Sequence, residues 1–376
     1  MSAIKKILLI TRPITPPWDE ASKNFAFYLA KNLRENLEIN LMTKGILPDL
    51  PSNIRQHPIY TTAKIADFNL EQKLRSLYFQ FRNKEKFDIF HYFFTPTKLN
   101  SCLIKSILKS KKGKTIQTVA ALREDLWSDE DIKNLMFSDL IITYSDYAKE
   151  KLNKLGFENV KRVYPGIDIQ EYRKTEKDPA LTKEKNISEN DFVINFTGEY
   201  TRLGAIDIVI DSFIEITKKI PEARLALAVR IKNDKDATKK KEVMAKLKEA
   251  GVLEKVSFFD EGNYKMSPVY NLCDISLFPV SDMNGKFDIP LAVVEAMASE
   301  KPVILSNLPI LKELTDSDNS VIIPKGNQEA LIEAVLELYH SPAKREQIGK
   351  AARKFVEERF DIKNVASTYQ KIYETL

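Results

Sequence analysis

The sequence predicts an α/β protein built from two doubly wound parallel sheets. Twelve short apolar runs, rich in β-branched residues, alternate with longer amphipathic stretches. This alternation is typical of parallel strands that helices cover on both faces. The runs fall into two series separated by the polar stretch 174–191. The length of 376 residues also suits two domains better than one.

Each series contains six predicted strands. The first series begins its strands at Lys5, Glu38, Asp88, Lys114, Asp139 and Val160. The second begins them at Val193, Ala223, Lys255, Asp274, Pro302 and Ser320. We therefore expect a first domain over residues 1–173, a linker over 174–191, a second domain over 192–359 and a terminal helical segment over 360–376.

The composition excludes several classes of protein. The 58 basic and 53 acidic residues give a net charge of +5, which is too mild to require a nucleic-acid partner. Cys102 and Cys273 lie far apart and have no metal or redox spacing, which favours reduced thiols and a cytoplasmic location. No apolar run is long enough to cross a bilayer, and the N-terminal KKILLIT is better read as a strand than as a signal segment.

Residues that follow the strands are the first candidates for a site, because open α/β sheets bind ligands at the carboxyl ends of their strands. With two such domains we expect the site in the cleft between them. After the first strand, Ser22 or Asp19 suits the start of a helix, whose N–H groups favour a diphosphate. A plain structural turn is the alternative.

Three cations follow strands of the second series. Arg202 follows VINFTG, and Arg230 and Lys232 follow ARLALAV. A guanidinium group matches a diphosphate through paired hydrogen bonds. The alternatives are an ion pair from Arg202 to Glu199 or Asp207, and a solvated lysine-rich loop for the other two.

Glu295 is the one acid in an otherwise apolar helical stretch, LAVVEAMA. A carboxylate there is costly unless it accepts hydrogen bonds, and sugar hydroxyls are natural donors. Lys286 and Asp288 precede this helix. His91 lies in the aromatic strand DIFHYFF, where we expect it at the strand end near a ligand, with a core position as the alternative.

The stretch KFDIPLAVVEAMASEKP resembles the acidic donor-binding helix of family 4 glycosyltransferases, which have the GT-B fold. The segments TYSDYAKEKL and YPGIDIQEY resemble further elements of that family. The sequence departs from the family pattern at Glu20-Ala21-Ser22, where Gly-Gly is usual, and at Glu199, where Arg is usual. Gly285 replaces the first acid of the Glu-x7-Glu motif, and Glu300 stands where the family has Gly.

The resemblance implies two Rossmann-like domains facing a cleft, with the terminal helix crossing back to the N-terminal domain. It implies a retaining, metal-independent transferase that moves a sugar from a nucleotide-sugar to a hydroxyl of a glycan or lipid-linked acceptor. The nucleotide-sugar is a substrate, and no cofactor is expected. The implied donor contacts are Arg202, Arg230, Lys232, Lys286 and Ser22 for phosphates, Glu295 for the ribose, and Asp288 and His91 for the sugar.

Two other functions remain open at this point. One is a catalytically weak GT-B binding protein, and the other is a GT-B sugar-nucleotide epimerase. Two short Asp-x-Asp patterns, at 129–131 and 316–318, are interpreted as surface turns, so we predict no metal site.

Two stretches of the first domain, 71–87 and 98–114, mix basic and apolar residues. Basic amphipathic helices can lie on an anionic membrane, which would suit a lipid-linked acceptor at the inner membrane face. The alternative is that each helix buries its apolar face on its own sheet.

Overall fold

The computed structural model describes residues 4–376 except 17–20, 63–67, 95–96, 109 and 261–263. The chain divides into two compact units. The first unit comprises Met1–Asp168, Gly285–Ile289 and Arg359–Leu376, and the second comprises Ile169–Asn284 and Pro290–Glu358. Residues 174–191, which the sequence suggests as a linker, lie inside the second unit and include helix α6, Pro179–Glu184.

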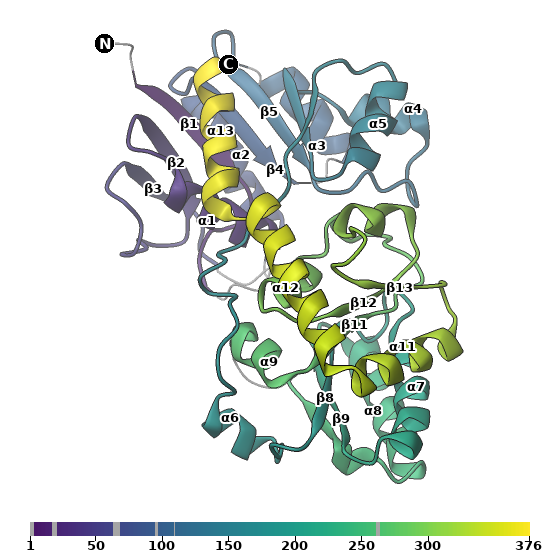
Figure 1. Ribbon diagram of the computed structural model, residues 1–376. Helices are drawn as coiled ribbons and strands as arrows, with labels where there is room; N and C mark the ends of the chain where they lie inside the picture. The colour runs from purple at the N-terminus through teal and green to yellow at the C-terminus, as the bar shows by residue number, and fades with distance from the viewer. Residues whose placement is uncertain (1–3, 17–20, 63–67, 95–96, 109, 261–263) are drawn as a thin grey trace. The chain divides into compact units, whose positions relative to one another are not determined.

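The first unit contains a seven-stranded parallel sheet in the order β3-β2-β1-β4-β5-β6-β7 (Figure 1). Its strands are β1 Lys5–Ile10, β2 Leu37–Thr43, β3 Ile54–Pro58, β4 Ile89–Phe93, β5 Lys114–Val119, β6 Leu140–Thr143 and β7 Val160–Arg162. Its helices are α1 Ala21–Asn32, α2 Leu70–Asn83, α3 Lys98–Leu103, the π-helix Ile104–Leu108, α4 Asp129–Leu135, α5 Asp146–Lys154 and α13 Ile362–Thr375.

Strand β3 is the one described strand of this sheet that the sequence does not predict. It lies at the sheet edge, and only Ile54 of its five residues is buried. An edge strand needs no continuous apolar run, because water solvates one of its sides. Its sequence, IRQHP, therefore carries no strand signal, and Pro58 is tolerated at its end.

The terminal helix α13 belongs to the first unit and packs against α1, which confirms the predicted return of the chain to the N-terminal sheet. Lys5 of β1 donates through its Nζ to the backbone oxygens of Tyr373 (3.1 Å) and Glu374 (2.9 Å). These are among the last carbonyls of a helix, which lack partners within the helix itself. Figure 1 shows α13, in yellow, beside the purple β1.

The second unit contains a six-stranded parallel sheet in the order β10-β9-β8-β11-β12-β13. Its strands are β8 Phe192–Gly198, β9 Ala223–Val229, β10 Val256–Phe258, β11 Ile275–Phe278, β12 Val303–Ser306 and β13 Val321–Ile323. Its helices besides α6 are α7 Ile206–Lys219, α8 Asp234–Glu249, α9 Met266–Leu272, α10 Leu291–Ala298, α11 Gln328–His340 and α12 Pro342–Arg359, with 3₁₀ turns at Leu253–Lys255 and Pro309–Leu314.

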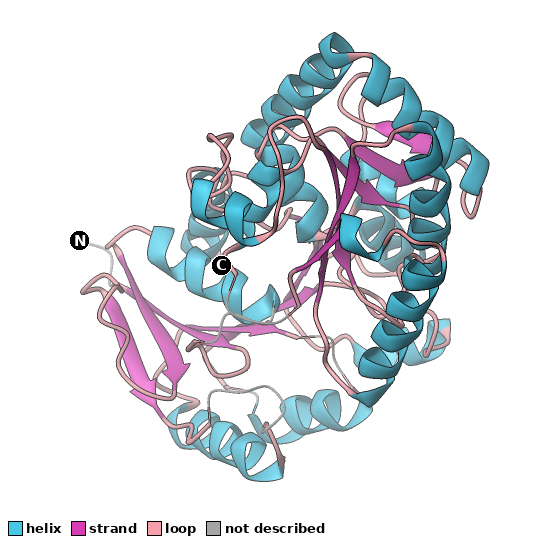
Figure 2. Ribbon diagram, turned by 90° about the horizontal axis from the view of Figure 1, so that it is seen from below, coloured by secondary structure: helices cyan, strands magenta, loops and turns pink. Residues whose placement is uncertain are grey.

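The two sheets share one topology, which confirms the predicted doubly wound α/β class. In each sheet the strand order reverses beside the first strand of the unit, between β1 and β4 in one and between β8 and β11 in the other. Figure 2 shows helices on both faces of the strands. Ligands of such sheets bind at the carboxyl ends of the strands beside this reversal.

Candidate donor-binding site

Glu199 follows the carboxyl end of β8 and holds two of the predicted donor cations. The Arg202 guanidinium donates from Nε to Glu199 Oε2 at 2.6 Å and from Nη2 to Oε1 at 2.7 Å. Lys232 Nζ donates to Glu199 Oε1 at 2.6 Å. The Glu199 side chain is only 7% exposed. The structure thus brings Arg202 and Lys232 together, around one carboxylate.

The loop after β8 has a constrained backbone. Leu203 and Gly204 have φ angles of +73° and +60°, a region that disfavours a side chain such as that of leucine. The Ser281 N–H donates to the Leu203 carbonyl at 2.7 Å, and a Cβ on Gly204 would lie 2.9 Å from Ser281 Oγ. The loop is therefore fixed against the carboxyl end of β11.

Helix α7 begins directly after this loop. Its N-cap residue is Ala205, whose side chain has no oxygen to accept a hydrogen bond from the first N–H groups of the helix. An alanine cannot satisfy the first N–H groups of a helix, and these groups favour a nearby anion. The start of α7 and Arg202 therefore both offer donors at the carboxyl end of the sheet.

Asp236 connects this loop to the loop after β9. It is 3% exposed and accepts from Thr201 Oγ1 at 2.7 Å and from the Lys232 N–H at 3.0 Å. Arg230, earlier in the β9 loop, is exposed. The loops that carry the three predicted phosphate-binding cations thus follow the neighbouring strands β8 and β9, and two of the cations share Glu199.

Glu295 lies on α10 and is half-buried. The hydroxyl of the fully buried Tyr270 donates to Glu295 Oε2 at 3.0 Å. Burial raises the pKa of Glu295 to about 7, and the charge of Glu171 raises the pKa as well. Hydrogen bonds from Tyr270 and Tyr172, together with the charge of Arg230, oppose this rise in pKa. Its charge therefore changes near neutral pH.

Lys286 and Asp288 belong to the other unit. Asp288 is 6% exposed, accepts a hydrogen bond from Ser145 Oγ, and donates its N–H to the Ala120 carbonyl at 2.8 Å. Ser145 also accepts from the Ala148 N–H at the start of α5. The segment 285–289 is thus fastened to the first unit, and Lys286 within it is half-buried.

His91 is a core residue, and its predicted position at a strand end requires correction. It is 0% exposed and lies in the middle of β4, which continues to Phe93. Its Nδ1 is 2.6 Å from the Tyr373 hydroxyl, and its Nε2 is 2.7 Å from Thr118 Oγ1. Burial lowers the pKa of His91 well below its ordinary value, so the ring stays neutral. It joins α13 to the sheet.

Ser22 lies in the first turn of α1 and is half-buried. Asp19, the alternative helix cap, lies outside the described residues, as does Glu20. The phosphate contact predicted for Ser22 therefore stays a prediction.

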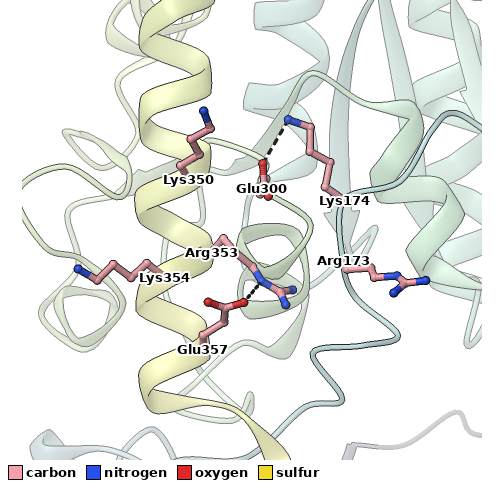
Figure 3. Close-up of a pocket in the computed structure, with 7 residues that line it drawn as sticks. All are labelled: Arg173, Lys174, Glu300, Lys350, Arg353, Lys354 and Glu357. Carbon is pink, nitrogen blue, oxygen red and sulfur yellow. Dashed lines mark hydrogen bonds and ion pairs between the residues drawn. The ribbon is translucent and has the colours of Figure 1, made fainter.

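A separate cavity of about 420 Å³ lies in the second unit (Figure 3). Its lining residues are Arg173, Lys174, Glu300, Lys350, Arg353, Lys354 and Glu357. Arg353 Nη1 donates hydrogen bonds to the backbone carbonyls of Ile169, Tyr172 and Ala298, at 2.7 to 3.0 Å. Figure 3 shows Arg173 and Lys354 pointing in opposite directions. Arg353 therefore joins three backbone segments of the second unit beside this cavity.

The Asp-x-Asp patterns are parts of ordinary structure. Asp129 pairs with Lys151 at 2.7 Å, and Asp131 pairs with Lys98 at 2.6 Å. Asp316 donates its N–H to Asn319 in a turn. Across the described ranges, no group of three or more His, Cys, Asp or Glu side chains is arranged to hold a metal ion.

Helix α2 exposes most of its large apolar residues, and Leu77 and Phe79 are half-buried against the core. Its buried positions are Gln72, Ser76 and Gln80. Gln72 exchanges hydrogen bonds with Thr61, at 2.7 and 3.0 Å. Its exposed large apolar residues, with the exposed fraction of each, are Leu70 (69%), Leu74 (54%), Tyr78 (65%) and Phe81 (47%). None of the helices in the described ranges is long and apolar enough to cross a membrane.

Residues 177–355, which make up most of the second unit, match the family model described as glycosyl transferases group 1. Over these residues the chain is similar to group 1 glycosyltransferases. The chain is 25% identical to the capsular polysaccharide biosynthesis glycosyltransferase CapM of Staphylococcus aureus over 62% of this chain and 58% of CapM. It is 21% identical to an uncharacterized glycosyltransferase of Methanocaldococcus jannaschii over 66% of this chain and 62% of that protein. The matches span about three fifths of the length of these relatives.

Solved structures with a similar fold cover almost the whole chain. HepE of Anabaena, solved in complex with UDP, has a TM-score of 0.76 at 16% identity, over 99% of this chain and 100% of HepE. Sucrose-phosphate synthase of Thermosynechococcus elongatus has a TM-score of 0.78 at 15% identity, over 99% of this chain and 98% of the synthase. The chain thus has the predicted GT-B fold.

Sequence reasoning missed several residues of this candidate site. Tyr270 lies 25 positions before Glu295, in an apolar helix where a tyrosine gives no sign of its partner. Asp236 resembles an ordinary charged residue at the start of α8. Glu199 was considered only as the alternative partner of Arg202. Its position where the family has a base is the signal that could have found it.

Proposed function

We propose that this protein is a glycosyltransferase that moves a sugar from a nucleotide-sugar to a hydroxyl acceptor. The observation that carries the proposal is the pair of cations, Arg202 and Lys232, that converge at the carboxyl ends of β8 and β9, within residues that are similar to group 1 glycosyltransferases. The reversal point of a doubly wound sheet is where nucleotides bind. The structures of HepE with UDP and UDP-glucose support a nucleotide-sugar ligand for this fold.

In this proposal the second unit binds the nucleotide. Arg202, Lys232 and Arg230 bind the diphosphate, assisted by the N–H groups at the start of α7. Glu295 accepts hydrogen bonds from the ribose hydroxyls, most strongly as a carboxylate, in which both oxygens are acceptors. In the first unit, Asp288 and Lys286 orient the sugar, and Ser22 contacts a phosphate. His91 has no part, because its ring is 0% exposed.

The proposed reaction retains the configuration at the anomeric carbon. The bond between this carbon and the leaving phosphate oxygen breaks, and its electron pair stays on the diphosphate. The acceptor oxygen forms the new bond on the same face, and its proton passes to the departing phosphate oxygen. Arg202 and Lys232 stabilise the charge that develops on the diphosphate, so a metal ion is not required.

The direct test is an assay of the full chain against a panel of nucleotide-sugars, with EDTA present and with simple sugar alcohols as acceptors. The proposal predicts transfer, or slow hydrolysis, with one donor, and NMR of the product should show the donor's anomeric configuration. Conversion of the donor alone into a second sugar nucleotide would instead identify an epimerase. Inactivity with every donor, together with no binding of any nucleotide, would contradict the proposal.

We further propose that the acceptor is reached at an anionic membrane surface, through helix α2. Leu74 and Tyr78 are exposed while Gln72 and Ser76 of the same helix are buried. The helix half-buries Leu77 and Phe79 against the core beside its own sheet, and the exposed Leu74 and Tyr78 lie outside that contact. Lys73, Arg75 and Arg82 are exposed on the same helix, and bases beside exposed apolar groups favour anionic lipids.

Co-sedimentation with lipid vesicles tests this surface. The full chain should bind vesicles that contain phosphatidylglycerol and bind pure phosphatidylcholine weakly. The double variant Leu74→Ser/Tyr78→Ser should lose about tenfold of this binding. Ile322→Ser, which changes a 47% exposed side chain on β13, is the matched control and should bind as wild type does. Unchanged binding of the double variant, or its conversion from a dimer to a monomer, would contradict the membrane role.

A further inference from the structure

Glu199 occupies the position at which the cations of the donor site would meet a phosphate. Its carboxylate accepts two parallel hydrogen bonds from Arg202 and a third from Lys232, all at 2.6 to 2.7 Å. Paired hydrogen bonds from a guanidinium group fit a carboxylate and a phosphate equally well. The anion that these two cations hold in the structure is therefore the protein's own side chain.

The nearly buried carboxylate favours this pairing with two cations. Glu199 is 7% exposed, whereas Arg202 and Lys232 are 41% and 42% exposed, so water screens these contacts in part. Asp236, 3% exposed, lies between the same two loops and adds a second negative charge. A diphosphate that approaches Arg202 must therefore either displace Glu199 or accept its repulsion.

We propose that Glu199 is an internal counter-anion that competes with the diphosphate of the donor for Arg202 and Lys232. This inference rests on the proposed function and assigns Glu199 a regulatory role in the same site. Without a diphosphate, Glu199 pairs with both cations, whose side chains remain 41% and 42% exposed. When a diphosphate binds, Glu199 exchanges its hydrogen bonds for that ligand, and when the diphosphate product leaves, Glu199 pairs again with the cations.

Glu199 therefore lowers the affinity of the site for diphosphates. The same two cations and helix N-terminus without this carboxylate would bind a diphosphate more tightly. A weaker grip on the product favours its release, a step that limits turnover in many transferases. In the opposite role, Glu199 serves only to orient Arg202 and Lys232 for the ligand. The two roles predict opposite effects when the charge of Glu199 is removed.

The test is calorimetric titration of the full chain with inorganic pyrophosphate and with UDP, ADP and GDP. Glu199→Gln keeps the size of the side chain and removes its charge. It should bind pyrophosphate and the preferred nucleotide about fivefold more tightly than wild type. The control Glu215→Gln removes one charge from a 44% exposed acid that pairs with Lys218 in the later turns of α7, and its affinity should change less than twofold.

Two further comparisons keep the outcome unambiguous. Glu199→Ala should shift the affinity in the same direction, and thermal unfolding of both variants checks that they are folded. Affinity for pyrophosphate that is unchanged, weaker or undetectable in both variants would overturn the inference. If pyrophosphate binds more tightly but no nucleotide binds to any form, the inference stands and the proposed glycosyltransferase function fails.

Discussion

His91 in the first unit and Glu295 in the second are two titratable side chains that burial affects in opposite ways. His91 is completely enclosed, and both ring nitrogens have partners, on β5 and α13. Glu295 is half-buried, with Tyr270 donating to one of its oxygens. Burial lowers the pKa of His91 and raises the pKa of Glu295 to about 7. Both residues are therefore held toward their neutral forms, for different purposes.

Accessibility and the number of hydrogen-bond partners separate a structural polar residue from a functional one. The partners of His91 are complete, so its polarity serves to join α13 to the sheet. Glu295 remains accessible in part and titrates near neutral pH, which is a common property of groups in binding sites. The same contrast predicts opposite dependences of stability on pH for the two residues.

The largest expected effect is the loss of stability in His91→Ala. The variant leaves a cavity and removes partners from Tyr373 and Thr118, which should lower the free energy of unfolding by about 3–4 kcal/mol. Urea denaturation followed by fluorescence measures this loss. Nucleotide affinity of the folded variant should not change, and a large drop in that affinity would return His91 to the binding site.

The next effect is a pH-dependent difference in stability between wild type and Glu295→Gln. The raised pKa means that folded Glu295 keeps its proton up to about pH 7, whereas the unfolded chain loses it near its ordinary value. The contribution of Glu295 is therefore present at low pH and is lost as the pH rises through about 7. Relative to the glutamine variant, wild type should lose about 2 kcal/mol between pH 5 and pH 8.

The contribution of His91 to stability should depend on pH in the opposite direction. Its folded pKa is depressed, so its contribution to stability is present above the ordinary histidine pKa and is lost as the pH falls below it. Comparing the urea midpoints of wild type and His91→Ala at several pH values measures this contribution. A stability difference that does not change with pH for either residue would remove the contrast between them.

A smaller effect is expected on donor affinity. Glu295 accepts ribose hydroxyls as a carboxylate, so the affinity for a nucleotide-sugar should rise through about pH 7, by about tenfold in total. The nucleotide-sugar is the right probe, because its diphosphate lacks the phosphomonoester ionisation near pH 6 that a free nucleotide has. Glu295→Gln should bind weakly at every pH. If the affinity of wild type were as independent of pH as that of Glu295→Gln, the proposed contact between Glu295 and the ribose would be contradicted.

The smallest effect is expected for Tyr270→Phe. Loss of the hydroxyl removes a hydrogen bond that favours the Glu295 carboxylate, so the midpoint of the affinity profile should move to higher pH. At pH 7.5 the affinity should fall about threefold, and at high pH it should recover. Loss of affinity by the same factor at all pH values would indicate a packing role for Tyr270 instead.

Much of the fold was predictable from the sequence, because parallel strands buried on both faces carry continuous apolar runs. Strand β3, the described strand that the sequence did not predict, lacks such a run because it lies at an exposed edge. The sequence left two orientations open for helix α2, because burial of Gln72 depends on a hydrogen bond to Thr61, which lies outside the helix. Local periodicity cannot report such a partner.

The candidate site was predictable in part. Arg202 and Lys232 were found because they follow neighbouring strands, a rule that sequence order alone can apply. Their common partner Glu199 was only an alternative, because the choice between an ion pair and a ligand contact depends on geometry. His91 was placed too near the strand end, because aromatic residues on both sides hide where a strand stops.

The most direct test of the whole account is titration of the preferred nucleoside diphosphate into wild type and Arg202→Ala, with Lys239→Ala as a control that removes a cation paired to Asp207. The account predicts at least a tenfold loss of affinity in Arg202→Ala and less than a twofold change in the control. Equal affinities for wild type and Arg202→Ala would contradict the claim that the diphosphate is bound at the carboxyl end of β8.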